Sequence, residues 1–374
     1  MPKTGARSVA STQDPAPRTR HPEPSAQNLV PRTLLVTGGA GFIGSNFVRH
    51  ILAQHSDVRV VNYDKLTYAG NLENLADVNE GERYHFVRGD ISDPKAVART
   101  FEDEKPWAVV SFAAESHVDR SILDATPFVD TNVKGTQVLL ETIRRYPVER
   151  FVQISTDEVY GALGEEGAFT ESSPIQPNSP YAACKAAADL IALAYAKTYG
   201  LPIVVTRSSN NYGPYQFPEK LVPLMIRNAL TGKELPIYGE GRQVRDWLHV
   251  EDNCRAIDVV LHKGLTGEVY NIGGECEKRN IEVVKLICEI LRNHPGARDL
   301  RPKIQFIKDP RGAAHDFRYA LDCSKIKREL GWAPLLDFEE GMERTVAWYL
   351  SNREWTERVI TGEYQEYYRK IYGT

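Results

Sequence analysis

Four side chains of this sequence form a pattern that suits proton transfer. Asp157 and Glu158 follow the apolar run FVQIS, and Tyr181 and Lys185 in YAACK stand four residues apart, on one face of a predicted helix. Two adjacent carboxyl groups in a closed site can supply one acid and one base, because their like charges raise the pKa of one of them. A tyrosine base needs its pKa lowered from about 10 to about 7, worth about 4 kcal/mol, and a nearby lysine favours that change. The alternatives are a solvated acidic loop and a chance spacing, so the surrounding elements must decide.

A glycine-rich turn near residue 38 is one of these elements. The β-branched run TLLVT precedes GGAGFIG, and SNFVRHILAQH then repeats apolar residues with helical spacing. The turn matches G-x-G-x-x-G at Gly39, Gly41 and Gly44, and G-x-x-G-x-x-G at Gly38, Gly41 and Gly44. Missing side chains allow a tight turn and let a pyrophosphate reach the positive N-terminus of the helix. When such a pattern stands alone, a flexible turn is the alternative.

An acidic residue at the end of the next predicted strand favours a dinucleotide ligand. Asp64 ends VRVVNYD, about 20 residues after Gly44, where a carboxylate accepts hydrogen bonds from the adenosine ribose hydroxyls. It would repel a 2′-phosphate, and no arginine follows it closely, so we predict NAD rather than NADP. The predicted cofactor contacts in this part of the chain are Gly38, Gly41, Phe42, Ile43, Gly44, Asp64, Lys65, Thr67, Asp90, Ile91, Ala113, Ala114 and Thr131.

Strand-like and helix-like segments alternate through the first half of the chain. The runs YHFVRGD, WAVVSFAA, RFVQIS and PIVVTR are separated by helical stretches such as PKAVARTFEDE and TNVKGTQVLLETIRRY. This alternation predicts an α/β fold with a doubly wound parallel sheet of the Rossmann type. Ligands of such sheets bind beyond the carboxyl ends of the strands. We therefore expect FVQIS to bring Thr156, Asp157 and Glu158 to the rim of the cofactor crevice.

Composition divides the chain into a tail and two lobes. Residues 1–31 are rich in Pro, Ser, Thr and charge, which predicts a disordered tail; its arginines also suggest a transit peptide, but its prolines would break an amphipathic helix. Residues 32–206 form the predicted NAD-binding domain, with a return segment at about 246–270. Proline and loop signals after PIVVTRSSNNYGP predict a smaller C-terminal substrate-binding lobe at 207–245 and 271–374.

The overall composition argues against several classes of function. A net charge of −4 offers no basic surface for nucleic acid, so a small molecule is the better partner. Five cysteines stand far apart in no metal-ligand spacing, and we expect no metal and free thiols in a reducing cytoplasm. No stretch approaches about 18 consecutive apolar residues, so we expect no membrane span. Nucleophile-elbow and phosphate-binding P-loop motifs are absent from the sequence.

Eight motifs, unusual in combination, run from about residue 32 to the C-terminus. They are TGGAGFIGSNF, FAAESHVDRSI, STDEVYG, SPYAACK, SSNNYGPYQFPEKLVPL, PIYGEGRQVRDWLHVED, YNIGG and YQEYYRKIYG. Together they resemble the extended short-chain dehydrogenases/reductases and, within them, the dTDP-glucose 4,6-dehydratase family. The resemblance implies a lyase that acts on a nucleotide sugar, and a homodimer joined through helices that include FVDTNVKGTQVLLETIR and YAACKAAADLIALAYAK.

The resemblance also implies a dehydration built from two internal redox steps. Tyr181 would take the proton of the sugar 4-hydroxyl while C4 passes hydride to NAD. Lys185 would lie beside Tyr181 and contact the cofactor, and Thr156 would steady the 4-oxygen. The 4-ketone acidifies the neighbouring C5–H. Glu158 would then remove the C5 proton and Asp157 would protonate the departing 6-hydroxyl. Hydride returns to C6, which yields dTDP-4-keto-6-deoxyglucose and regenerates NAD.

Asp157 separates this expectation from related chemistries on the same scaffold. UDP-galactose 4-epimerases resemble this chain but usually lack the acid pair, because they only oxidise and re-reduce C4. UDP-glucuronate decarboxylases and GDP-mannose dehydratases commonly read S-T-S-E, with Ser in place of the Asp. Three alternatives stay open: the same dehydration on UDP-glucose, an epimerase or decarboxylase, and an NAD-binding regulator without turnover.

The second lobe is expected to hold the substrate. By resemblance, Asn210 contacts the substrate and Asn211 the nicotinamide side of the cofactor. Arg245 suits a pyrophosphate because a guanidinium offers paired donors, and its alternative is a surface ion pair with Asp246. The other predicted substrate contacts are Ser116, Thr156, Lys220, Leu221, Pro236, Tyr238, Asn280, Arg311, His315 and Tyr372.

One segment departs from the family pattern. The family usually shows D-R-P-G-H-D before R-Y-A-x-D, whereas this chain reads DPRGAAHDFRYALD, which is two residues longer and exchanges Arg and Pro. Arg311 and His315 best match the phosphate-binding pair. The insertion could displace the arginine, in which case nucleotide affinity or base choice would differ from the family pattern.

Overall fold

The structure, a computed structural model, describes residues 31–78, 80–312 and 315–360. Most of the predicted N-terminal tail, and Tyr372, lie outside these residues, so both expectations stay predictions. Within the described residues, strands and helices alternate along the chain in the order that the sequence predicted. The α/β fold class is therefore confirmed.

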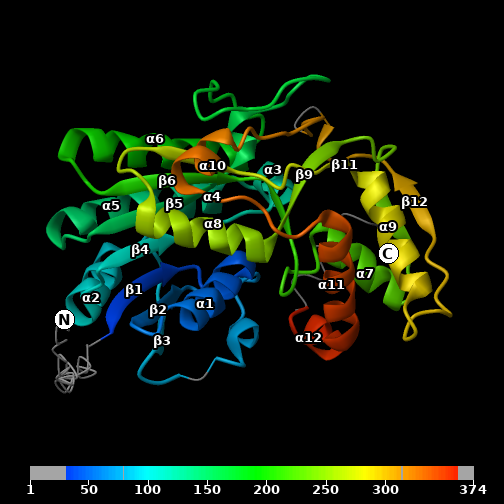
Figure 1. Ribbon diagram of the computed structural model, residues 1–374, viewed down its shortest axis with the longest axis horizontal. Coiled ribbons are helices and arrows are strands. Elements are labelled where there is room, and N and C mark those ends of the chain that lie inside the picture. Colours follow the sequence, from blue (N-terminus) through cyan, green and yellow to red (C-terminus); the bar gives the residue numbers. More distant parts are fainter. Residues whose placement is uncertain (1–30, 79, 313–314, 361–374) are drawn as a thin grey trace, which may run out of the picture. The chain divides into compact units, whose positions relative to one another are not determined.

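Seven parallel strands form the central sheet of the described residues (Figure 1). The chain adds β2 and β3 on one side of β1 and then returns to place β4 on the other side. This reversal between β1 and β4 is the switch point where doubly wound sheets bind ligands. In sheet order the strands are β10 (Val269–Ile272), β6 (Ile203–Ser208), β5 (Arg150–Thr156), β4 (Ala108–Ser111), β1 (Arg32–Thr37), β2 (Val58–Asp64) and β3 (Tyr84–Arg88).

Successive residues of the strands pack against opposite layers of helices. Leu34 and Val36 belong to the apolar core on one face, and Leu35 to the core on the other. Both faces of the sheet are covered, which explains why β1 is a continuous apolar run rather than an alternating one. One layer contains α1 (Phe42–Gln54) and α8 (Val250–Lys263); the other contains α2 (Pro94–Glu104), α5 (Thr136–Arg145) and α6 (Pro180–Tyr199).

Long segments that contain short helical elements connect β4 to α5 (residues 112–135) and β5 to α6 (residues 157–179). A π-helical turn precedes α5, and its Asn132 side chain both accepts a hydrogen bond from the main-chain N of Glu115 and donates one to its O, at 2.9 Å each. This pairing fixes the segment that follows β4. The short elements are η1 (Leu72–Leu75), α3 (Val118–Leu123), α4 (Thr126–Phe128), η2 (Val129–Gly135) and η3 (Asp157–Tyr160).

A second lobe follows β6 and has its own apolar core, separate from the two cores of the central sheet. The chain leaves the sheet at β7, returns to it for α8 and β10, and leaves it again at β11. α10 (Ser324–Leu330) packs back against β10 and α8. The predicted domain boundaries stay a prediction. The lobe contains β7 (Asn210–Tyr212), α7 (Leu221–Leu230), β8 (Leu235–Tyr238), β9 (Val244–His249), β11 (Glu277–Arg279), α9 (Asn280–Asn293), β12 (Ile304–Ile307), α11 (Phe338–Ser351) and α12 (Arg353–Arg358).

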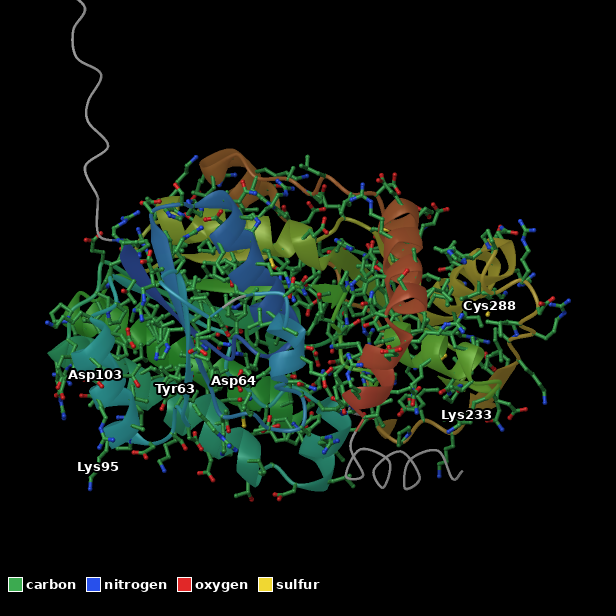
Figure 2. The ribbon with its side chains drawn as sticks, turned by 90° about the horizontal axis from the view of Figure 1, so that it is seen from below. Tyr63, Asp64, Lys95, Asp103, Lys233 and Cys288 are labelled. Carbon is green, nitrogen blue, oxygen red and sulfur yellow. The ribbon has the colours of Figure 1, made fainter. Side chains whose placement is uncertain are left out.

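Buried and exposed charges differ clearly in their positions (Figure 2). Lys95 and Asp103 of α2 project from the rim of the molecule and are exposed. Tyr63 and Asp64, at the end of β2, lie inside, and Asp64 is only 7% exposed. A buried carboxylate is unusual unless it has hydrogen-bond partners, so Asp64 marks a built site at the end of this strand.

The described part of the chain has no helix with the length and apolar character needed to cross a bilayer. Its five cysteines are free thiols, as predicted, and four of them are buried.

The turn between β1 and α1 requires glycine at two positions. Gly38 adopts a φ of +71°, and a Cβ there would lie 2.5 Å from the main-chain N of Ala113, just beyond β4. A Cβ on Gly44 would lie 2.2 Å from the main-chain O of Gly38. Both neighbours are backbone atoms, so neither can rotate away. The missing side chains let α1 begin directly against the ends of β1 and β4.

We predict that Gly44→Ala destabilises the protein by about 1–3 kcal/mol, because the added methyl group forces the turn and α1 apart. The shift in the midpoint of urea unfolding measures this change. Gly164→Ala is the matched control, because no atom lies within 4 Å of a Cβ at Gly164. Equal midpoints for the two variants would contradict the prediction.

Candidate active site

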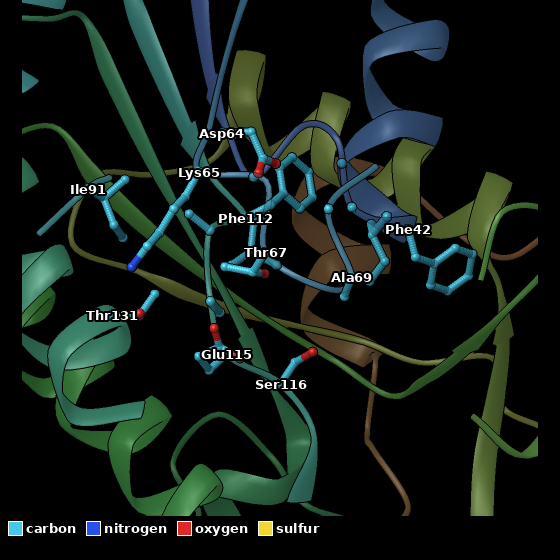
Figure 3. A pocket seen from close by; sticks show the side chains of 18 of the residues that line it. Phe42, Asp64, Lys65, Thr67, Ala69, Ile91, Phe112, Glu115, Ser116 and Thr131 are labelled. Carbon is cyan, nitrogen blue, oxygen red and sulfur yellow. The ribbon is translucent and has the colours of Figure 1, made fainter. Parts of the chain in front are cut away.

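A first cleft opens beyond the carboxyl ends of β1, β2 and β4, at the switch point (Figure 3). Figure 3 shows the Lys65 side chain reaching across the cleft toward Thr131; its Nζ lies 2.6 Å from Asp90 Oδ2. Every predicted cofactor contact except Asn211 lines this cleft. These residues are Gly38, Gly41, Phe42, Ile43, Gly44, Asp64, Lys65, Thr67, Asp90, Ile91, Ala113, Ala114, Thr131, Tyr181 and Lys185.

Asp64 is held by the backbone around it. Its Oδ2 accepts a hydrogen bond from the main-chain N of Ala40 at 3.0 Å, and its Oδ1 accepts one from Leu66 at 2.8 Å. Each carboxylate oxygen can accept a further hydrogen bond. Burial raises the pKa of Asp64, and the two backbone donors lower it in part. The carboxylate is thus oriented toward the cleft, where it can accept hydrogen bonds from the hydroxyl groups of a ligand.

A second cleft lies between the first lobe and the second. Asn211 lines this cleft rather than the first, and Tyr372 lies outside the described residues. Ser116 lines the first cleft only, and Thr156 lines neither. The other predicted substrate contacts line the second cleft; they are Asn210, Lys220, Leu221, Pro236, Tyr238, Arg245, Asn280, Arg311 and His315.

Three neighbouring residues, Gln216, Glu219 and Lys220, line both clefts and so join them. Lys220 Nζ donates a hydrogen bond to the main-chain O of Ser116 at 3.0 Å. Glu219 accepts a hydrogen bond from the Tyr68 hydroxyl at 3.1 Å. A ligand in one cleft is therefore next to a ligand in the other.

The acid pair occupies the point where β5 ends. Thr156 caps the turn η3: its Oγ1 accepts a hydrogen bond from the main-chain N of Glu158 at 3.3 Å and donates one to Asp157 Oδ1 at 3.2 Å. Asp157 is 2% exposed, and its Oδ2 has no hydrogen-bond partner among the described residues. Glu158 lines the second cleft. Two carboxyl groups are thus fixed side by side, one behind the cleft surface and one in it.

The surroundings separate the two carboxyl groups electrostatically. Burial, Glu158 and Asp246 raise the pKa of Asp157 well above its usual range. Burial also raises the pKa of Glu158, but Arg311, Arg245 and Lys220 oppose that rise. Asp157 is therefore the group that favours the protonated form, and Glu158 the group that cations keep closer to ionised. These shifts are in the directions that an adjacent acid and base require, and the catalytic roles of the two residues stay a prediction.

Tyr181 and Lys185 lie on the first turns of α6, and the Tyr181 hydroxyl bonds to the Thr156 side chain. Burial raises the pKa of Tyr181, Glu158 adds to the rise, and a hydrogen bond with the Thr156 side chain lowers it in part. Lys185 Nζ donates a hydrogen bond to the main-chain O of Ile154 at 2.5 Å. Burial lowers the pKa of Lys185 to about 8, although Asp189, one turn along α6, opposes the change. The ammonium is held at the floor of the first cleft, between β5 and α6.

Cations gather in the second cleft. Lys220, Arg245 and Arg311 line it together with His315, whose pKa burial and the two arginines lower to about 4. Arg245 is buried and Arg311 partly buried, and both carry their charge at all ordinary pH values. This cleft suits a ligand with several negative oxygens, such as a pyrophosphate.

Arg245 does not form the surface ion pair that was its alternative. Its guanidinium is buried and donates to the main-chain O of Val244 at 2.7 Å and of Asp316 at 2.9 Å. It also stacks on the Tyr319 ring, 4.4 Å from the ring centre. The Asp246 carboxylate accepts main-chain hydrogen bonds from Gly274 and Cys276 instead.

Asp119 of α3 is a site residue that sequence reasoning missed. It accepts a hydrogen bond from the Tyr238 hydroxyl at 3.1 Å and forms an ion pair with the Arg311 guanidinium. A residue of the first lobe thereby holds two predicted substrate contacts of the second lobe. Asp119 and Glu219 both belong to motifs quoted above, FAAESHVDRSI and FPEKLVPL, and a charged residue inside such a motif was the available signal.

Comparisons with known proteins identify the family of this chain. A family model described as GDP-mannose 4,6 dehydratase matches residues 35–345. The dTDP-glucose 4,6-dehydratase of Xanthomonas campestris pv. campestris (strain B100) is 52% identical over 345 residues, which cover 89% of this chain and 97% of that protein. The chain belongs to the dTDP-glucose 4,6-dehydratase family. The resemblance stated from the sequence is confirmed.

Solved structures of dTDP-glucose 4,6-dehydratases share the fold. The enzyme from Bacillus anthracis in complex with NAD is 50% identical, with a TM-score of 0.80, and the match covers 88% of this chain and 100% of that one. The enzyme from Streptomyces venezuelae with NAD and TYD bound is also 50% identical, with a TM-score of 0.82 and the same coverage. Arg311 and His315 both line the second cleft.

We predict that Glu219 makes stability fall as pH rises. Burial raises its pKa to about 7 in the folded protein, against an ordinary value of 4.5. The folded state then binds the proton more tightly than the unfolded state, so this contribution is complete below about pH 4.5 and is lost as pH rises through about 7. Glu219→Gln should lose this dependence and gain up to about 3 kcal/mol relative to wild type between about pH 5 and pH 8. Urea unfolding at several pH values measures it.

The exposed Glu240 gives the matched control, Glu240→Gln, which should follow the wild-type pH dependence. A difference between Glu219→Gln and wild type that stays constant with pH would rule out the titration of Glu219 as the cause.

Proposed function

We propose that this protein is an NAD-dependent dTDP-glucose 4,6-dehydratase that forms dTDP-4-keto-6-deoxyglucose and releases water. The observation that carries the proposal is the position of Asp157 and Glu158, side by side at the end of β5, with Glu158 in the second cleft and both close enough to affect Tyr181 of the first cleft. An epimerase needs only the tyrosine, whereas removal of water also needs a base for C5 and an acid for the 6-hydroxyl. The family of the chain supports the same reaction.

The first cleft fits NAD. The N-terminus of α1 has no side chain in the way of a pyrophosphate, since Gly38, Gly41 and Gly44 line the cleft there. Asp64 offers its carboxylate to a ribose and would repel a 2′-phosphate. When bound, NAD supplies the acceptor for the C4 hydride and the donor for the C6 hydride. Lys185 lies at the floor of the cleft, within the reach of a ribose hydroxyl.

Tyr181 acts as the base for the sugar 4-hydroxyl. Its own environment raises the pKa, so the tyrosinate forms only when positive charge is nearby. Lys185, one turn further along α6, and the positively charged ring of the cofactor are the two sources of that charge. The Thr156 hydroxyl, which bonds to Tyr181, would steady the 4-oxygen by giving it the hydrogen that it now donates to Asp157.

Glu158 removes the C5 proton and Asp157 protonates the departing 6-hydroxyl. Glu158 lines the second cleft and has three cations near it, which favour the ionised base. Asp157 is buried, and one of its oxygens has no hydrogen-bond partner in the part of the chain that the structure describes, which favours the protonated acid. The Asp157 proton goes to the leaving oxygen, and the C5 proton goes to Glu158, so the step releases one water. As C6 receives hydride, Glu158 returns a proton to C5, and the Asp157 carboxyl is re-protonated from solvent before the next turnover.

The nucleoside diphosphate occupies the second cleft. Arg245 and Arg311 face the pyrophosphate, and Lys220 connects it to the sugar at the junction of the clefts. Tyr238 and Asn280 lie further along the same cleft. Among the relatives, the Streptomyces venezuelae enzyme was crystallised with NAD and TYD. These contacts support dTDP-glucose as the substrate, with UDP-glucose as the competitor that an experiment must separate.

The proposal includes a homodimer and a place in the cytoplasm. Val129, before α5, and Leu190, on α6, are large apolar residues that are about half exposed, and a partner subunit would cover them. The five free thiols suit a reducing compartment. Sedimentation of the purified protein tests the dimer directly.

We predict that the protein alone dehydrates dTDP-glucose in deuterated water. The product should weigh one water less than the substrate, apart from one deuterium gained at C5, because Glu158 exchanges its proton with solvent. Mass spectrometry of the sugar nucleotide measures both changes. Parallel incubations with UDP-glucose and GDP-mannose, without added reductant, test the nucleotide.

If UDP-glucose is dehydrated as fast as dTDP-glucose, the enzyme does not prefer thymine over uracil, and that part of the proposal is wrong. A C4 epimer without loss of water would favour the epimerase, and no change in any sugar nucleotide would favour the regulator.

We predict that Asp157→Asn slows dehydration by about 100- to 10,000-fold, the usual contribution of a positioned acid, but slows C4 oxidation by less than about tenfold. An amide cannot supply the proton that the leaving hydroxyl needs. Single-turnover absorbance of NADH should therefore rise and persist. Glu165→Gln, a change of an exposed acid in the loop after η3, is the control and should keep the wild-type time course. Equal loss of both steps would contradict the assigned roles.

A further inference from the structure

Three histidines converge on one carboxylate at the far end of α1. His50 lies in the last turns of α1 and His55 directly follows it, while Asp258 and His262 stand one turn apart on α8. His50 Nε2 lies 2.9 Å from Asp258 Oδ2, and His55 Nε2 lies 3.0 Å from the same atom. His262 Nδ1 lies 2.9 Å from Asp258 Oδ1. Nothing in the proposed reaction uses this cluster.

The donor atoms have nearly the spacing of a tetrahedral metal site. The chosen donor atoms of His55, Asp258 and His262 all lie within 4.8 Å of one another. Around Zn²⁺, with bonds of about 2.0–2.1 Å, neighbouring tetrahedral ligand atoms are about 3.3–3.4 Å apart. The nitrogen-to-oxygen distances of 2.9 and 3.0 Å are a few tenths of an ångström shorter. Small side-chain rotations would open the hydrogen-bonded cluster to admit the ion.

The cluster is enclosed but reachable from solvent. The side chains of Asp258 and His50 are 14% and 17% exposed, and those of His55 and His262 are 27% and 28% exposed. The least exposed residue is the carboxylate at the centre, and the two more exposed histidines form the outer side. A cation can therefore enter without unfolding either helix.

We propose that His55, Asp258 and His262 bind a divalent cation of the class that prefers imidazole, with Zn²⁺ as the representative ion. His50 holds the Asp258 carboxylate in place by a hydrogen bond, and solvent completes the coordination. Two nitrogens and one carboxylate suit Zn²⁺, Co²⁺, Ni²⁺ or Cu²⁺. Ca²⁺ and Mg²⁺ need more oxygen ligands than the single carboxylate supplies.

Two existing features oppose the binding of a cation: a hydrogen bond of His262 and the positive charge of Arg32. His262 Nδ1 also lies 2.9 Å from the main-chain O of Asp258, so an ion at Nδ1 replaces the proton now shared there. The Arg32 guanidinium lies 4.4 Å from the centre of the Trp107 ring, which lies beside His262, and it carries a positive charge. Asp57 forms an ion pair with Arg32 at 3.4 Å, and its negative charge offsets that positive charge.

The site would clamp two helices rather than take part in the proposed chemistry. Gly41 precedes α1 at the first cleft, and 13 residues of helix at about 1.5 Å each place His55 about 20 Å away. α8 packs against α1 along this length. A bound ion would therefore raise the stability of the α1–α8 layer and leave the substrate steps unchanged. The inference does not rest on the proposed function.

The first test is calorimetric titration of the full, untagged chain with ZnCl₂ after treatment with a chelator. We expect one equivalent to bind. The double variant His55→Gln/His262→Gln should lose this equivalent, and His50→Gln should weaken it by about 10- to 100-fold, as for other residues that orient a ligand. The matched control is His85→Gln/His294→Gln, which removes two histidines elsewhere and should bind as wild type does.

A second measurement locates the ion without depending on the folding of the double variant. The ring centres of Trp107 and His262 lie 6.0 Å apart, so Co²⁺ or Cu²⁺ in the site should quench Trp107 fluorescence. In the Trp107→Phe variant, the part of the tryptophan fluorescence that the metal ion quenches should disappear, while one equivalent of the ion still binds. Co²⁺ bound to wild type should also give the intense visible bands of a tetrahedral site.

The absence of stoichiometric binding by wild type would overturn the proposal, as would equal binding by the site variant and the control. The cluster would then be a hydrogen-bonded His–Asp network and nothing more. Dehydratase activity is measured separately, in the presence of chelator, and its presence or absence leaves this result unaffected.

Discussion

The constraint on which the rest of the site depends is the placement of two adjacent carboxyl groups at the end of β5, Asp157 buried and Glu158 partly buried. A buried carboxylate is costly unless it is protonated, paired or hydrogen-bonded. Among the described residues, the Thr156 hydroxyl is the one hydrogen-bond partner of the Asp157 side chain, so burial drives Asp157 toward the protonated form. Glu158 is stabilised by Arg311, Arg245 and Lys220, all of which follow β6 in the chain. The second lobe is therefore necessary for the acid pair as well as for a ligand.

The two lobes are coupled by the same electrostatic demand. Asp119 comes from α3 beside the central sheet, and it binds Arg311 and Tyr238 from the second lobe. The pair that orients Arg311 also sets its distance from Glu158. Lys220 similarly bonds to the main chain at Ser116, at the edge of the first cleft. Charges that a substrate pyrophosphate would meet are thus already fixed by the first lobe, which reduces the rearrangement that binding requires.

The sequence predicted what local patterns encode. Runs of apolar, β-branched residues predicted the strands of the sheet. The glycine spacing predicted the turn after β1, where a side chain on Gly38 would clash with the backbone of Ala113. The acid pair and the Tyr181–Lys185 spacing were readable because each lies within one element. Asp119 with Arg311 and His55 with Asp258 are separated by 192 and 203 residues. No periodicity links such residues, so neither pair could be predicted before the fold was known, and the expectation of no metal rested on spacing alone.

The least expected feature of the site concerns the tyrosine. Sequence reasoning assigned Lys185 the task of lowering the Tyr181 pKa, but the structure directs the ammonium to the main-chain O of Ile154, and burial raises the tyrosine pKa. The two facts agree if Lys185 serves as a fixed positive charge below the ligand rather than as a direct partner of the phenol. A phenol that ionises only when cationic charge occupies the first cleft is inactive as a base in its absence. Proton abstraction at the sugar is then tied to occupancy of the cofactor cleft, and the adjacent acid pair meets a ketone only after that step.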